Sequence, residues 1–362
     1  MILDFSPMAK VTMWKALIAW EPPLQSRKLA STSNTEPNEE RVYIPKELYG
    51  DWNSCPTDPF PDFEGVVNYA KSAGVWDALQ KNIEKEDYAS VITTPATPLV
   101  SEIAVEISLK SQFDIVNLAL KKTCPPGSTI VLASGKAAMK DIDVDARAHM
   151  EPDRASFYHA YSVETEEWCF CICDYDNNTK NVNLIPGEVK VSYKFKMSFL
   201  TGTKRDFDSG VAIPDLTRSL EAEKVFTQVY QYMNQLGAHY GYLITDRELI
   251  CIRRCDETVY GAMDLSASIP LSTAEGNLNA KLALWYLHHR YVIHDPSETR
   301  MPRTPTTATW EDDVRKIYDK RKEREDEEFK QASKRAHYEK NTKQKNRSRT
   351  NLRSDAQFGN SF

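Results

Sequence analysis

The spacing of apolar residues divides the chain into a helical first part, a run of strands and a second helical part. Helical spacing begins near Phe63 and continues to about residue 83. A longer helical periodicity covers residues 99–122. Its apolar positions are Leu99, Ile103, Ile107, Phe113, Val116 and Leu120. Short apolar or alternating segments then predict strands. They lie at residues 128–134, 139–146, 154–163, 167–176 and 188–200.

After the strands the pattern becomes helical again. Residues 221–238 are spaced as a helix, and residues 239–254 as a two-stranded hairpin that turns at Thr245-Asp246. Residues 276–294 are spaced as a last apolar helix. The order of helix, three or more strands, helix, strands and helix predicts a mixed α/β (α+β) domain, with a central sheet flanked by helices.

Both ends of the chain differ in composition from this middle part. Residues 21 to about 60 are rich in Pro, Ser, Thr, Asn and Glu, so we expect them to be irregular and to bury little core. Residues 301–310 are typical of a linker, and the mostly charged stretch from Glu311 predicts one exposed helix. We therefore expect three parts. They are an irregular, disordered N-terminal segment (1–60), a compact domain (61–295), and a linker with a charged helix and a basic disordered tail (296–362).

The composition excludes some classes of protein. The 362 residues are 41% hydrophobic with a mean hydropathy of −0.54, and no window approaches the ~20 apolar residues that a membrane span needs. No secretory signal is expected at the N-terminus. The seven cysteines are an odd number, which argues against a disulfide framework. We expect an intracellular protein of the nucleus or cytoplasm that does not bind membranes.

The net charge of −6 is unevenly distributed. Residues 330–362 carry about +7, so the remainder of the chain carries about −13. A basic tail can contact nucleic-acid phosphates, act as a nuclear-import signal, or be a solvated end without a specific role. The acidic body argues against broad, non-specific binding to nucleic acid.

The candidate chemistry lies on two of the predicted strands. Asp153 precedes the strand 154–163, and Glu188 and Lys190 begin the strand 188–200. Because alternate residues of a strand share a face, Glu188 and Lys190 project together while Val189 points into the core. If the two strands are neighbours, two carboxylates and an ammonium group converge. Such a group suits a hard cation such as Mg²⁺.

At this point the sequence resembles a family. Pro152-Asp153 with Glu188-Val189-Lys190 is similar to the PD-(D/E)XK signature of the restriction-endonuclease-like nucleases. The predicted α-β-β-β-α-β order is similar to their fold. Residues 183–195, NLIPGEVKVSYKF, and the later YGYLITDREL stretch look like a largely uncharacterised fungal group of these proteins. The likeness covers residues 99 to about 255.

The resemblance implies roles for named residues. Asp153 and Glu188 would bind Mg²⁺ or Mn²⁺, with the Val189 carbonyl completing the shell, and Lys190 would be the catalytic lysine. A glutamate of the preceding helix often joins such sites, and the candidates are Glu102 and Glu106, one turn apart.

Three further residues would contact the substrate. Lys194 lies four residues beyond Lys190, on the same face of the predicted strand, and would contact a phosphate. Gln228 and Tyr232 fit the QxxxY pattern of the RecB-like branch, in which these side chains lie near the DNA and the metal site.

The sequence leaves alternatives open. Asp153 and Glu188 are 35 positions apart and the predicted strand 167–176 lies between them, so their strands need not be adjacent. Glu188 and Lys190 are also compatible with a plain ion pair at a sheet edge. The favoured function is a metal-dependent nuclease that acts on DNA or RNA through this site, with the basic tail adding attraction. The alternative is a catalytically inactive nuclease-like fold that serves as an interaction, regulatory or accessory protein in a fungal pathway.

Overall fold

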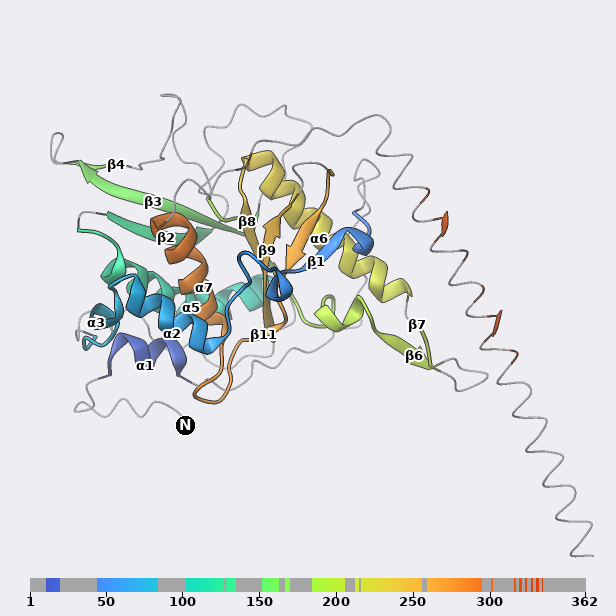
Figure 1. Ribbon diagram of the computed structural model, residues 1–362, viewed down its shortest axis with the longest axis horizontal. Coiled ribbons are helices and arrows are strands. Elements are labelled where there is room, and N and C mark those ends of the chain that lie inside the picture. The colour runs from blue at the N-terminus through green and yellow to red at the C-terminus, as the bar shows by residue number, and fades with distance from the viewer. Residues whose placement is uncertain are drawn as a thin grey trace, which may run out of the picture. The chain divides into compact units, whose positions relative to one another are not determined.

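The computed structural model describes most of the middle of the chain and parts of its ends (Figure 1). The described residues are 11–19, 44–83, 102–126, 128–134, 152–162, 167–169, 184–205, 212–214, 216–255, 259–294, 301 and isolated positions between 316 and 334. The chain divides into two compact units. The first comprises Met1–Met197 and Ala222–Thr306, and the second Ser198–Glu221 and Thr307–Phe362.

A mixed sheet forms the centre of the first unit. Its order is β1-β10-β9-β8-β5-β3-β2, with β11 paired to β9 and β4 paired to β3. The β5–β8 and β1–β10 pairs are parallel, and the other pairs are antiparallel. The strands are β1 (Tyr49–Asp51), β2 (Ser128–Ser134), β3 (Arg154–Ser162), β4 (Glu167–Cys169), β5 (Gly187–Lys190), β8 (Tyr240–Thr245), β9 (Glu248–Arg254), β10 (Met263–Leu265) and β11 (Ile269–Pro270).

The parallel pairing of β5 with β8 needs a crossover connection, since a tight turn cannot join parallel strands. The chain between them includes helix α6 (Leu216–Leu236). A side chain on Gly241 of β8 would come within 2.7 Å of the Met233 sulfur, so this glycine lets α6 approach the strand closely. The predicted helix at 221–238 and the predicted hairpin at 239–254 are thus both confirmed.

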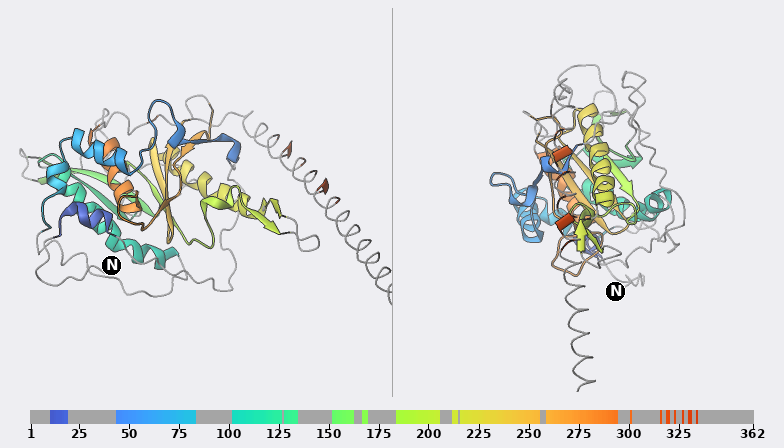
Figure 2. Two further views of the ribbon diagram at one scale, coloured as in Figure 1. Left: turned by 60° about the horizontal axis from the view of Figure 1, so that its bottom comes forward. Right: turned by 90° about the vertical axis from the view of Figure 1, so that its right-hand side faces the viewer.

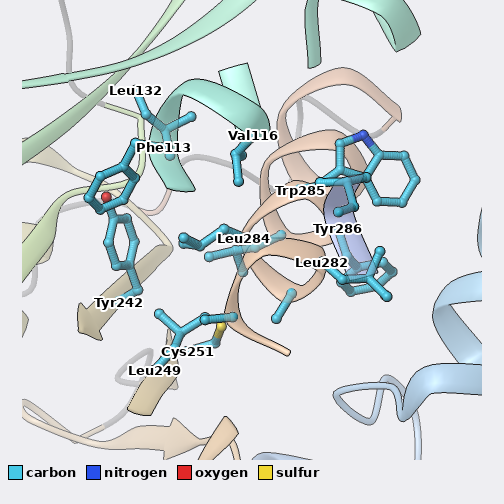
Figure 3. Close-up of a cluster of buried hydrophobic side chains, with 14 of the residues drawn as sticks. Phe113, Val116, Leu132, Tyr242, Leu249, Cys251, Leu282, Leu284, Trp285 and Tyr286 are labelled. Carbon is cyan, nitrogen blue, oxygen red and sulfur yellow. The ribbon is translucent and has the colours of Figure 1, made fainter. Parts of the chain in front are cut away.

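The remaining helices of this unit pack together against the sheet (Figures 1 and 2). They are α1 (Met13–Ile18), α2 (Phe63–Ser72), α3 (Trp76–Leu79), α5 (Glu102–Thr123) and α7 (Ala280–His288), the last followed by a π-helical turn at His289–His294. Figure 3 shows Phe113 and Val116 of α5 meeting Leu284 of α7, with Tyr242 of β8 beside Phe113. The coarse prediction of a mixed α/β fold with a sheet flanked by helices is confirmed.

Two expectations about burial are wrong. Residues 44–60 contribute to the core, because Trp52 is fully buried and packs its ring on Phe60 and Tyr240. The periodic apolar positions Ile103 and Ile107 of α5 are instead 69% and 55% exposed. The buried face of α5 instead runs through Val105, Leu109, Phe113 and Val116, and the two exposed isoleucines lie off that face.

The second unit contains a two-stranded antiparallel sheet of β6 (Thr203–Arg205) and β7 (Ala212–Pro214). The described positions between 316 and 334 are helical and exposed, as predicted for the charged helix. Residues 1–10, 20–43 and most of 296–362 lie outside the described part, so the irregular N-terminal segment and the basic tail stay predictions. Among the helices that the structure describes, none combines the length and the apolar character needed to cross a bilayer.

A buried histidine fixes the end of α7 against β3. His288 Nδ1 lies 2.7 Å from the Leu284 carbonyl and Nε2 lies 2.7 Å from Ser156 Oγ. Because a carbonyl can only accept, Nδ1 carries the hydrogen of the neutral ring and Nε2 is an acceptor. The Ser156 hydroxyl, which also lies 3.1 Å from the Ile185 carbonyl, shares its one hydrogen between that carbonyl and Nε2. Burial lowers the pKa of His288 to about 4, against the opposite effect of its bond to Leu284.

Acidification from pH 7 to pH 4.5 is expected to destabilise the parent protein more steeply than a His288→Gln variant. An unfolded histidine binds a proton near pH 6.5, whereas folded His288 stays neutral down to about pH 4. Between these values the unfolded state binds more protons, so stability falls as the pH falls. Urea midpoints at several pH values measure the two slopes. Equal slopes would contradict a neutral buried His288.

Candidate functional site

The two predicted motifs meet where β3 and β5 begin. These strands are antiparallel neighbours, with Arg154 opposite Gly187. Asp153 directly precedes β3, and its Oδ2 accepts a hydrogen bond from the backbone N–H of Val189 at 2.9 Å. Strand β4 pairs with the far end of β3 and does not separate the motifs. The 35 positions between Asp153 and Glu188 are therefore bridged by direct strand pairing.

Strand β5 presents its charged and apolar side chains on opposite faces. Glu188 and Lys190 share a face, and the Lys190 ammonium group donates a hydrogen bond to the Glu188 carboxylate. The Val189 side chain is buried in the core, as predicted. Both charged side chains are enclosed, at 9% exposed for Lys190 and 2% for Glu188. The pair is thus a buried ion pair rather than a solvated one at a sheet edge.

The structure separates the two candidate glutamates of α5. Glu102 Oε1 lies 3.6 Å from the Lys190 ammonium nitrogen. Glu106, one turn further along, accepts from Arg154 Nη1 at 3.1 Å. The Arg154 guanidinium group also lies over the Phe113 ring, with 4.0 Å between the guanidinium carbon and the ring centroid. Glu102 therefore lies beside Lys190 and Glu106 beside Arg154, while burial and the charge of each glutamate raise the pKa of Asp153.

Lys194 does not lie on the strand face that the sequence predicts. β5 ends at Lys190, and residues 192–194 form a turn. The cause is Asp246, whose buried carboxylate accepts from Ser192 N at 2.6 Å and from Ser192 Oγ at 2.8 Å. The turn brings the Lys194 ammonium nitrogen to 3.2 Å from Glu102 Oε1. Lys194 thus lies near Lys190 because of the turn, and not because the two residues share a strand face.

Burial and mutual charge shift the protonation equilibria of these groups. Burial raises the pKa of Glu188 to about 7, although the Lys190 ammonium group works in the opposite direction. Burial also raises the pKa of Asp153, against Lys190 and the N–H of Val189. Burial alone would lower the pKa of Lys190, but Glu188, Glu102 and Asp153 hold it above its ordinary value. The pKa of Glu188 is therefore raised towards neutral pH, while Lys190 stays charged.

One atom of the site suggests that a cation fits there. Among the residues that the structure describes, Glu188 Oε2 is buried and has no hydrogen-bond partner, which is costly for a carboxylate oxygen unless something satisfies it. Asp153 and Glu188 supply the oxygen ligands that Mg²⁺ and Mn²⁺ favour. Within the described residues, no three His, Cys, Asp or Glu side chains are arranged as a ready metal-binding group. The candidate ligands for a cation are thus the carboxylates of Asp153 and Glu188, and the second of these contains the oxygen without a partner.

The predicted substrate residues Gln228 and Tyr232 lie one turn apart on α6. Gln228 Nε2 donates to Tyr232 Oη at 2.5 Å, and the Tyr232 side chain is almost fully buried. The QxxxY pattern therefore forms a bond within the helix. A contact of this pair with nucleic acid stays a prediction.

Two residues that shape the site were missed in the sequence. Arg154 follows Asp153 directly, and its charge next to a candidate ligand was the signal that could have drawn attention to it. Asp246 directly follows β8 in the segment Ile244-Thr245-Asp246, and an aspartate after an apolar strand is the corresponding signal.

Comparisons of the whole chain were made with protein-family models, with curated proteins and with solved structures. None of the three produced a match, so the geometry of the site carries the functional argument.

Proposed function

We propose that the protein is a metal-dependent nuclease of the PD-(D/E)XK type. The observation that carries the proposal is the convergence of Asp153, Glu188 and Lys190. The Asp153 carboxylate is bonded to the backbone of the residue between the other two, and Lys190 contacts Glu188 directly. Chance occurrences of a Pro-Asp and a Glu-x-Lys sequence would not be expected to meet on adjacent strands.

The order of elements supports the same proposal. The segment runs through α5, β2, β3, β5, α6 and β8, with β4 as an addition at the far end of β3 and with β6 and β7 between β5 and α6 in the sequence. This order agrees with the α-β-β-β-α-β order of the restriction-endonuclease-like fold, and the proposed fold assignment rests on that agreement.

In this proposal Asp153 and Glu188 would hold a Mg²⁺ or Mn²⁺ ion, with Glu102 and the Val189 carbonyl as further candidates. When bound, such an ion polarises a phosphate and lowers the pKa of a bound water. The chain itself contributes the Lys190 ammonium group, whose positive charge is retained at neutral pH. Fixed positive charge beside a phosphate stabilises the charge that develops during hydrolysis.

The proposed substrate is a nucleic acid inside the cell, in the nucleus or cytoplasm. Lys194 carries a positive charge next to Lys190, and Gln228 and Tyr232 are the remaining candidates for substrate contacts. The basic tail would add non-specific attraction to phosphates. Both DNA and RNA carry the phosphodiester on which these groups would act.

Incubation of the purified protein with labelled DNA and RNA, single- and double-stranded, tests the proposal. We expect cleavage with Mg²⁺ or Mn²⁺ and none in metal-free buffer. An Asp153→Asn variant should lose cleavage at least 100-fold, since a ligand and the bond that orients it are both altered. Cleavage that persists without metal, or that is equal in Asp153→Asn, would reject the proposed chemistry.

The pairing of both lysines favours a second candidate function. Lys190 and Lys194 each already contact carboxylates of the same chain. An inactive nuclease-like fold, used for interaction or regulation, would retain such pairs for stability alone.

Titration calorimetry with Mn²⁺ separates the two functions. The nuclease should bind Mn²⁺ in a manner that depends on Asp153 and strengthens from pH 6 to pH 8 as Glu188 loses its proton. The inactive protein should show no such binding.

A further inference from the structure

One carboxylate oxygen lies between two lysines at the edge of the candidate site. Glu102 Oε1 is 3.2 Å from the Lys194 ammonium nitrogen and 3.6 Å from that of Lys190. Lys190 belongs to β5, Lys194 to the turn that follows it, and Glu102 is the first residue of α5. The end of β5 and the turn that follows it thus present two positive charges to a single acidic oxygen.

A phosphate oxygen can take the place of such a carboxylate oxygen. Both are anionic acceptors, and both form short, charge-assisted bonds with ammonium groups. The charge balance also permits the exchange, since a phosphodiester carries one negative charge, as Glu102 does. Lys190 and Lys194 would then face the same net charge before and after the exchange.

The exposure of the groups allows the exchange as well. The side chains of Glu102 and Lys194 are about one third exposed, whereas Glu188 is enclosed. An ion pair that water reaches contributes only about 0–1 kcal/mol, so an incoming anion displaces it at little cost. Glu106 differs, because its partner Arg154 is buried against Phe113.

We propose that Lys190 and Lys194 form a phosphoryl-binding subsite, which the Glu102 carboxylate occupies in the ligand-free protein. A phosphoryl group of the substrate displaces Glu102 and binds both ammonium groups. The subsite deepens the proposed nuclease function and rests on it for the choice of a phosphoryl ligand. In this subsite Glu102 competes with the phosphoryl group for the two lysines and does not act as a metal ligand.

Binding of two probes in metal-free buffer tests the subsite. The probes are inorganic pyrophosphate and a six-residue oligothymidylate, measured by calorimetry with the full chain. Glu102→Gln removes the competing charge and should tighten binding about two- to fivefold, the worth of an exposed ion pair. Lys194→Ala should abolish that gain in the double variant. Tighter binding of the oligothymidylate identifies a nucleic-acid backbone as the ligand, and tighter binding of pyrophosphate identifies a terminal or free phosphate.

Glu106→Gln is the matched control, since it removes an equal charge one turn away on the same helix. Its effect on probe binding should be clearly smaller than that of Glu102→Gln. Equal gains in both variants, or an unchanged affinity in Glu102→Gln, would overturn the subsite. Circular dichroism and unfolding midpoints establish that each variant is folded.

The failure of this inference is distinguishable from the failure of the nuclease proposal. Probe binding is measured without metal and without turnover, so it does not depend on cleavage. Cleavage in a protein whose Glu102→Gln variant binds no tighter would reject the subsite alone. Tighter binding in a protein that never cleaves would support the subsite and reject the nuclease.

Discussion

Replacement of Lys190 by methionine is expected to lower metal-dependent cleavage by about 10²- to 10³-fold, the usual effect of removing one charged group that stabilises developing negative charge. Methionine keeps most of the length and apolar volume of the lysine stem but lacks the ammonium group. Initial cleavage rates at saturating Mg²⁺ and pH 7.5 measure the effect.

The matched control for this prediction is Lys110→Met. Lys110 lies on α5 and is 68% exposed, and its ammonium group pairs only with Asp114 among the ion pairs of the described residues. Its loss should leave the cleavage rate within twofold of the parent. Cleavage by Lys190→Met at the parental rate would remove Lys190 from the proposed mechanism.

The same Lys190 substitution also affects stability, in a manner that depends on pH. Without the ammonium group, Glu188 remains buried with no counter-charge beside it, and an uncompensated buried charge is strongly destabilising. Protonation relieves this cost. The loss of stability should therefore be small at pH 5.5 and larger by about 1–2 kcal/mol at pH 8. The sign follows from Glu188. When the pKa of an acid is higher in the folded state than in the unfolded state, the protein loses stability as the pH rises between the two values.

A double variant separates the two effects of the substitution. Lys190→Met/Glu188→Gln removes the buried charge together with its partner, so the single variant should lose stability relative to the double variant as the pH rises from 5.5 to 8. Its cleavage rate should be no higher than that of Lys190→Met. Denaturant unfolding at pH 5.5 and pH 8 compares the single and double variants. A cost of Lys190→Met that is equal at both pH values would contradict the buried ion pair.

The elements that the sequence predicts well are those with many turns of regular spacing. Helices α5, α6 and α7 and the β8–β9 hairpin each have an apolar face long enough to determine their type. The end of β5 could not be predicted in this way. Val191 and Phe195 continue the apolar alternation beyond Lys190. The turn there depends on Asp246, which lies 54 positions further along the chain.

The sequence also predicts only some of the residues that make up the site. The sequence predicts that Asp153, Glu188 and Lys190 share a location, because each is placed by its own strand. The choice between Glu102 and Glu106 depends on Arg154, a third residue whose side chain could have faced either way. Helical spacing puts both glutamates on one face and therefore cannot separate them. The position of Lys194 depends likewise on the turn.

Gly187→Ala is expected to cost about 3 kcal/mol of stability, at the upper end of what overpacking a core costs. A Cβ atom at position 187 would lie 2.2 Å from Cζ of the Tyr242 ring and 2.6 Å from its hydroxyl oxygen. Tyr242 is fully buried beside Phe113 (Figure 3), so its ring has no space into which to move. β5 must then shift away from β8, and Glu188 shifts with it.

Two comparisons show that this cost arises from the ring. Gly74→Ala places its Cβ in open space at a backbone φ of +73°, so it should cost only about 1 kcal/mol of backbone strain. Tyr242→Leu removes the ring atoms that the new Cβ would meet, and in that background Gly187→Ala should cost much less than in the parent. A double-mutant cycle from urea unfolding measures this coupling. Equal costs in the two backgrounds would show that the cost does not arise from the Tyr242 ring. The position of Glu188 would then not depend on the close approach of Gly187 to Tyr242.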